Sequence, residues 1–200
     1  MDDRAVRLLL RAAAASLLLT GCVGLQLPEP RRALPAAPAK LATVVPAPQP
    51  VAKAESDNCN IPNLREAALR QVNLARASVR ACGPIRMRPA NALAWDPALA
   101  SAALQHSSDM ATRGYFDHIS PDGRRVGYRV SFEGYNWRTV GENLAGGDST
   151  LAGAIRGWLG SPTHCQNLMN PAFVEVGGAC VHQPGSQWGY YWTLVLAARR

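Results

Sequence analysis

Two histidines in turn-rich segments offer the widest scope for chemistry. His118 lies within residues 116–123, which end in a serine-proline-aspartate-glycine run, and His164 follows a second serine-proline pair two residues upstream. Proline and glycine in such runs predict tight turns, and turns tend to display functional side chains. Glu142 and Glu175 supply carboxylates that an imidazole can pair with. Such a set could bind a divalent cation, act as a general base on water, or form a polar network that fixes loops.

The segment Gly141-Glu142-Asn143 carries the central carboxylate. Apolar residues flank it, which predicts a strand over residues 139–145, and consecutive strand residues point to opposite faces. We therefore expect either Glu142 or Asn143 to point inward, and a buried carboxylate needs a partner such as histidine. The sequence predicts a ligand-binding cleft lined by His118, Glu142, Asn143, His164 and Glu175. Within it, His118, His164 and Glu142 are the candidate zinc ligands, or the catalytic residues of a hydrolase.

His106 has a different setting. It shares one helical face with Leu99, Ala103 and Met110, which favours a core histidine satisfied by a backbone partner. The sequence lacks a Gly-x-Ser-x-Gly elbow, a His-Glu-x-x-His helix, a P-loop and a dinucleotide-binding glycine pattern. The absence of an activated nucleophile favours binding over catalysis.

Helix and strand signals alternate through the second half of the chain. Capping residues and glycines predict helices from Asn63 to about Gly83, from Asp96 to Gly114 and from Ser149 or Thr150 to Gly160. Residues 139–145, 176–181 and 190–198 are expected to be strands, and the short loop between the last two predicts an antiparallel hairpin. The expected fold is α+β, a three-layer α/β/α sandwich around a mostly antiparallel central sheet.

Residues 1–21 are typical of an export signal, with three arginines before an apolar run that is too short to span a bilayer. Leu19-Thr20-Gly21-Cys22 resembles a bacterial lipobox, in which Cys22 is lipidated and becomes the mature N-terminus. The alternative is an ordinary cleaved signal with an incidental cysteine. Because Val23 is not acidic, lipoprotein sorting favours the outer membrane of a Gram-negative bacterium.

Residues 22–57 are rich in proline and alanine, which predicts a disordered, partly polyproline II tether ahead of a folded domain at 58–200. The formal charge of +7 and the pI near 9.6 indicate affinity for acidic surfaces such as lipid head groups. Nucleic acid is not expected as a partner, because the arginines are scattered and no basic helix or aromatic-interleaved patch occurs.

Four cysteines remain once Cys22 is set aside, an even number that favours two disulfides in an exported chain. Three pairings are possible from the sequence. Local pairing, Cys59 with Cys82 and Cys165 with Cys180, is the simplest. A metal site built from the four thiolates is the alternative, although no Cys-x-x-Cys spacing supports it.

Residues 64–196 resemble the CAP superfamily of cysteine-rich secretory, antigen 5 and pathogenesis-related proteins, and its bacterial branch in particular. The resemblance rests on several ordered motifs: Leu93-Ala94-Trp95-Asp96, His106-Ser107-Ser108-Asp109-Met110-Ala111, Phe116-Asp117-His118, Gly141-Glu142-Asn143-Leu144-Ala145, Ser161-Pro162 with His164, Asn170-Pro171, Glu175-Val176-Gly177 and Tyr191-Trp192-Thr193.

That resemblance implies an α/β/α sandwich with a central cleft that holds two histidines and two glutamates in eukaryotic members, some of which bind divalent metal. His118 and Glu142 match the first of each. The second histidine of those members has no counterpart at residues 189–194, whereas His164 matches a histidine that the bacterial branch carries after Ser-Pro.

No general reaction is established for this superfamily, and its members have been linked to lipid binding, signalling and occasionally proteolysis. We therefore expect an envelope-anchored module that binds a lipid, a cell-wall fragment or a peptide, with binding favoured over enzymatic activity. The alternatives are a hydrolase based on histidine and glutamate, with or without metal, and a purely structural envelope protein.

Overall fold

The computed structural model describes residues 59–200. The predicted export signal, the proposed lipidation site Cys22 and the predicted tether at 22–57 lie outside the described residues. In chain order the helices are α1 (Leu64–Arg76), α2 (Pro97–Arg113), α3 (Val126–Phe132), α4 (Leu151–Gly160) and α5 (Pro162–Leu168). The strands are β1 (Arg80–Cys82), β2 (Ile85–Met87), β3 (Ala94–Trp95), β4 (Trp137–Gly146), β5 (Glu175–His182) and β6 (Tyr190–Arg199).

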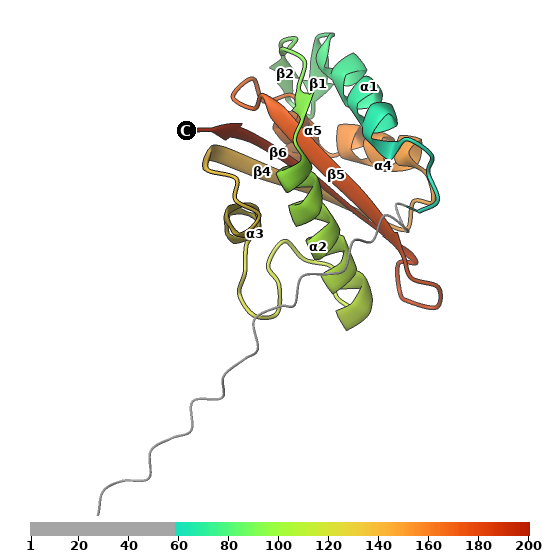
Figure 1. Cartoon of the computed structure of the whole chain (residues 1–200). Coiled ribbons are helices and arrows are strands. Elements are labelled where there is room, and N and C mark those ends of the chain that lie inside the picture. Colours follow the sequence, from blue (N-terminus) through green and yellow to red (C-terminus); the bar gives the residue numbers. More distant parts are fainter. Residues whose placement is uncertain (1–58) are drawn as a thin grey trace, which may run out of the picture. The chain divides into compact units, whose positions relative to one another are not determined.

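The central sheet has the strand order β3-β5-β6-β4 (Figure 1). β6 pairs antiparallel with both of its neighbours, and β5 and β6 form the predicted hairpin. β3 is the exception, since it runs parallel to β5 over two residue pairs. The α+β fold with a mostly antiparallel sheet is therefore confirmed.

Helices cover both faces of the sheet, and the alternation of side chains along β6 shows how. Trp192, Leu194 and Leu196 belong to the core cluster that includes α1, α4 and α5. Val195 and Ala197, which point the other way, pack with residues of α2 and α3. Both sets are buried, which is why the sequence of β6 is a nearly continuous apolar run. Figure 1 shows the resulting three layers.

The expected caps hold the two central helices. The Asp96 side chain accepts hydrogen bonds from the backbone N–H groups of Ala98 and Leu99 and so begins α2. Thr150 caps α4 by accepting from the N–H of Gly153. Within the described part of the chain, no helix combines the length and the apolar character needed to cross a membrane.

The first helix ends earlier than the sequence predicts, at Arg76 and not near Gly83. The chain from Arg80 to Met87 forms an antiparallel hairpin instead, in which Gly83 has a φ of +63°. Glycine adopts that conformation without steric cost, so the glycine that was expected to stop the helix forms the turn of a hairpin. The short helices α3 and α5 are too brief for a clear periodic signal.

The predicted presence of two disulfides is confirmed, but the predicted local pairing is wrong. Cys59 is bonded to Cys180 and Cys82 to Cys165, with Cα–Cα distances of 5.5 and 5.3 Å. The first bond ties the start of the described chain to β5, and the second ties the β1–β2 hairpin to α5. Tertiary packing brings these cysteines together across 121 and 83 residues, and sequence proximity gives no sign of it.

Candidate functional site

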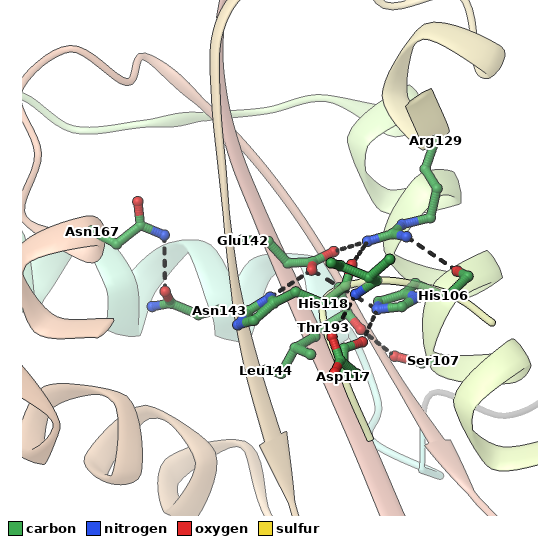
Figure 2. Close-up of polar contacts among 12 residues, drawn as sticks. His106, Ser107, Asp117, His118, Arg129, Glu142, Asn143, Leu144, Asn167 and Thr193 are labelled. Carbon is green, nitrogen blue, oxygen red and sulfur yellow. Dashed lines mark hydrogen bonds and ion pairs between the residues drawn. The ribbon is translucent and has the colours of Figure 1, made fainter. Parts of the chain in front are cut away.

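Four polar side chains from four different elements converge on one place beside β4. His118 lies in the loop between α2 and α3, Glu142 in the middle of β4, Arg129 on α3 and His106 on α2. Figure 2 shows the carboxylate of Glu142 between the imidazoles and the guanidinium. We call these four residues the His118 cluster.

His118 is the accessible member of the cluster. Its Nδ1 lies 2.8 Å from Oε1 of Glu142, and its side chain is 52% exposed, against 3% for that of Glu142. The hydrogen bond to Glu142 raises the pKa of His118, although partial burial opposes the shift. With Nδ1 donating inward, Nε2 has no hydrogen-bond partner among residues 59–200 and is free to meet a ligand.

Arg129 holds the other side of the carboxylate. Its guanidinium donates to Oε2 of Glu142 at 2.8 Å, and its side chain is only 2% exposed. It also donates to the backbone carbonyls of His118 and Arg124, at 3.1 and 3.0 Å. Burial alone would raise the pKa of Glu142, but the His118 hydrogen bond and the Arg129 charge lower it. Glu142 is therefore a buried carboxylate that stays ionised.

His106 is a core histidine with a backbone partner, as predicted. It is fully buried, and its Nε2 donates to the carbonyl of Asp117 at 2.9 Å. Burial lowers its pKa, so the imidazole is neutral at ordinary pH. Its Nε2 also lies 3.8 Å from Oε1 of Glu142, which places His106 beneath the His118–Glu142 pair.

Asn143 points to the opposite face of β4 from Glu142, as the strand alternation predicts (Figure 2). Its Nδ2 donates to the backbone carbonyl of His164 at 3.0 Å, and its Oδ1 accepts from Nδ2 of Asn167 at 2.8 Å. Asn143 is fully buried and thus fixes α5 to the sheet.

His164 lies on α5 and is half-buried. Burial lowers its pKa, and the nearby positive charge of His118 lowers it further. The charge of His118 therefore acts on the His164 imidazole, and the backbone carbonyl of His164 accepts a hydrogen bond from Asn143.

Glu175 is not part of this group. It lies at the start of β5, accepts a hydrogen bond from the hydroxyl of Tyr135, and pairs with Arg199 at 3.4 Å. The Arg199 guanidinium also stacks over the Tyr135 ring at 4.1 Å. The sequence predicted one cleft lined by five residues, but the structure places Glu175 in a separate network.

The arrangement does not fit a zinc site. Both oxygens of Glu142 are already engaged, one of them by the fixed positive charge of Arg129. Zinc needs three or four convergent nitrogen, sulfur or carboxylate donors. Among residues 59–200 no group of three or more histidine, cysteine, aspartate or glutamate side chains is arranged to hold a metal ion.

Arg129 is the cluster residue that sequence reasoning missed. It lies three residues after Val126 and one before Val130, so it shares the apolar side of a short helix. A charged residue on an apolar face is rarely buried without a partner. That pattern was the available signal for a buried arginine near a carboxylate.

The family described as "CAP: Cysteine-rich secretory protein family" matches residues 69–196, well over half of the chain. The chain is a member of the CAP family. The match includes all four residues of the His118 cluster.

Two curated bacterial relatives match part of this domain. "Uncharacterized protein YkwD" of Bacillus subtilis (strain 168) is 37% identical over 94 residues, 46% of this chain and 36% of that protein. "Uncharacterized membrane protein YlbC" of the same strain is 32% identical over 85 residues, 42% of this chain and 25% of that protein. The matched part is thus about a third or less of each relative's length.

Solved structures share the fold. An extracellular protein containing an SCP domain from Bacillus anthracis str. Ames has a TM-score of 0.54 at 28% identity, covering 68% of this chain and 41% of that one. An outer surface protein from Borrelia burgdorferi has the same TM-score at 18% identity, covering 68% of this chain and 95% of that one. The second likeness is one of fold alone.

Proposed function

We propose that this CAP protein is exported, anchored to the cell envelope through a lipid on Cys22, and binds a ligand at the outward face of His118. The ligand class is a lipid, a cell-wall fragment or a peptide that carries a phosphate or carboxylate oxygen. The observation that carries the proposal is the half-exposed imidazole of His118, hydrogen-bonded to the buried and ionised carboxylate of Glu142.

The chemistry of the His118 cluster supports an anionic ligand. A raised pKa favours the protonated imidazole, whose Nε2–H is then a charged hydrogen-bond donor. The other charges of the cluster, on Glu142 and Arg129, neutralise each other in the interior. The net charge that the cluster offers to a ligand is therefore the positive charge of His118.

Location outside the cytoplasm is supported by three independent features. The lipobox-like Leu19-Thr20-Gly21-Cys22 favours anchoring, and two disulfides are typical of oxidising compartments. Among the similar structures, one is an extracellular protein and another an outer surface protein. Anchoring at the outer membrane is the sorting outcome that Val23 favours.

A hydrolase is the second candidate, because one observation favours it. A buried carboxylate that fixes the tautomer and orientation of a histidine is the usual arrangement behind a general base. The four cysteines among residues 59–200 are paired in disulfides, so none of them is available as a thiol nucleophile, and a water molecule activated by His118 is the nucleophile we propose for such a reaction.

Calorimetry with three soluble probes tests the binding function: a short-chain phosphatidylglycerol, a muropeptide and an acidic peptide. The variant His118→Asn keeps an amide donor close to the position of Nδ1 but removes the outward Nε2. A charged hydrogen bond contributes about 1.5–3 kcal/mol, so we expect at least a tenfold loss of affinity for the bound probe.

His182→Asn is the matched control, because that imidazole stacks on Tyr190 away from the cluster. Unchanged affinity in His118→Asn together with lower stability would favour the structural alternative. Cleavage of a probe by the parent protein, with the cleavage lost in His118→Asn, would favour the hydrolase.

A further inference from the structure

One face of the domain carries basic residues with almost no acidic ones. The sequence contains no aspartate or glutamate from residue 67 to 95 or from residue 149 to 174. These two stretches form most of α1, the β1–β2 hairpin, β3, and all of α4 and α5. The His118 cluster lies on the other face of the sheet, where Asp109, Asp117, Asp122 and Glu133 lie in or beside α2 and α3.

Exposed arginines and exposed apolar side chains follow one another from the second half of α1 through the β1–β2 hairpin. Leu74 at the end of α1 is 73% exposed, and Val79 and Ile85 at the hairpin are each 48% exposed. Arg70, one helical turn before Leu74, is exposed, as are Arg86 and Arg88 on and after β2. We call these six residues the hairpin patch. Figure 1 shows the hairpin beside α1.

The arginines of the hairpin patch are not used to hold the fold. None of the three forms an ion pair with any residue between 59 and 200. Arg76, which lies between them in sequence, is the contrast. It is fully buried and donates to the carbonyls of Leu168, Asn170 and Phe173.

The β1–β2 hairpin, which carries apolar residues of the patch, is cross-linked to the rest of the domain. The Cys82–Cys165 disulfide ties the hairpin to α5, and the side chain of Gln166 donates to the carbonyl of Cys82. Val79 and Ile85 line a hollow of about 350 Å³ along the hairpin. Exposed apolar side chains among arginines suit a binding surface that is both negatively charged and apolar.

We propose that the hairpin patch is a docking surface for an anionic phospholipid membrane. Its arginines pair with lipid phosphates, while Leu74, Val79 and Ile85 enter the boundary between head groups and acyl chains. Such basic clusters gain affinity from every cation near the surface, and the apolar side chains add burial. Because the patch and the His118 cluster belong to opposite faces of the sheet, docking would leave His118 open to its ligand. The two proposals can fail separately.

Vesicle sedimentation tests the docking surface. The protein is the chain from Val23 to Arg200, which has no lipid anchor, and the vesicles are phosphatidylcholine with about 30% phosphatidylglycerol. An arginine near an anionic surface contributes about fivefold in affinity, so Arg86→Gln with Arg88→Gln should weaken binding on the order of 25-fold. Leu74→Ser with Ile85→Ser should also weaken it, and that loss should persist at high salt because it is not electrostatic.

The matched control is Arg113→Gln with Arg125→Gln, two exposed arginines beside α2 and α3 that remove the same charge from the other face. We expect this double variant to bind vesicles nearly as well as the parent protein does. Circular dichroism checks that each variant is folded.

Three results would overturn the proposal. An equal loss in both arginine pairs would mean nonspecific attraction by net charge. If inorganic phosphate, added as a probe at about 10 mM, abolished vesicle binding completely, the patch would be a site for free phosphate. Binding to the acidic polysaccharide alginate that depends on Arg86 and Arg88, without vesicle binding, would mean a carbohydrate partner.

Discussion

Glu142 and Arg129 form a buried ion pair that joins β4 to α3. Their side chains are 3% and 2% exposed, and the guanidinium lies 2.8 Å from Oε2 of the carboxylate. The same guanidinium donates a hydrogen bond to the backbone carbonyl of His118. The other carboxylate oxygen of Glu142 is hydrogen-bonded to the imidazole of His118. One buried pair therefore positions both the backbone and the side chain of the accessible histidine.

Breaking this pair should destabilise the protein strongly. In Glu142→Gln, the buried charge of Arg129 is left without a counter-charge, which costs about 3–5 kcal/mol of unfolding free energy. The pKa of His118 should also fall, because a neutral amide stabilises the protonated imidazole less than the carboxylate does. Urea unfolding and NMR titration measure the two effects. Glu66→Gln, at an exposed position, is the control and should change stability by less than about 0.5 kcal/mol.

Acid should destabilise the fold through His106. Its pKa is lowered by burial, so below pH ~6.5 the unfolded state binds more protons than the folded state. Stability is therefore lost as the pH falls from about 6.5 toward the folded pKa. His106→Gln offers an amide donor for the Asp117 carbonyl without titrating, and should flatten this dependence. Some slope should remain, because the pKa of His164 is lowered too. A slope identical to the parent between about pH 6.5 and 5 would contradict this account.

His118 acts in the opposite sense in a different pH range. Its pKa is raised in the folded state, so its contribution to stability is complete below about pH 6.5 and is lost as the pH rises through the folded value. The two effects can be separated because they lie on opposite sides of the ordinary histidine pKa.

The disulfide pairing can be read directly. A non-reducing protease digest analysed by mass spectrometry should give peptides that link Cys59 to Cys180 and Cys82 to Cys165. Replacing Cys59 and Cys180 together with serine should lower the unfolding free energy by about 2–5 kcal/mol. Peptides that link Cys59 to Cys82 would contradict the structure.

Gly177 should not tolerate a side chain. A Cβ there would overlap the backbone of Leu99 and Ala100, because α2 packs directly on β5. Gly177→Ala should cost about 3 kcal/mol or more of unfolding free energy. Gly178→Ala is the matched control one residue along the strand. Its Cβ would meet the flexible end of Leu194 at 3.1 Å and the Thr193 carbonyl oxygen at 3.5 Å, an ordinary contact distance, so the cost should be below about 1 kcal/mol.

Local signals predicted the long elements well. Asp96 and Thr150 mark helix starts, and the strand alternation correctly separated Glu142 from Asn143. These features depend on a few neighbouring residues. The early end of α1 was missed because a glycine with positive φ serves a hairpin turn as well as a helix end.

The structure brings together only part of the residue set that the sequence placed in one cleft. His118 and Glu142 meet as expected, but Arg129 comes from a short helix without a clear periodic signal, and it engages an oxygen of Glu142 that a zinc ion would need. The placement of Glu175 and the disulfide pairing differ from the predictions for the same reason. Their partners are fixed by the packing of distant elements, which spacing along the chain does not encode.

NMR titration of the His118 imidazole, with and without short-chain phosphatidylglycerol, tests whether His118 is the ligand-binding group. We expect the pKa of His118 to lie above the ordinary value of about 6.5 in the free protein. We also expect a further rise of the His118 pKa when the anionic probe binds, because the probe prefers the protonated form. A His118 pKa at or below the ordinary value, or probe binding that leaves it unmoved, would contradict the claim that His118 is the ligand-binding group.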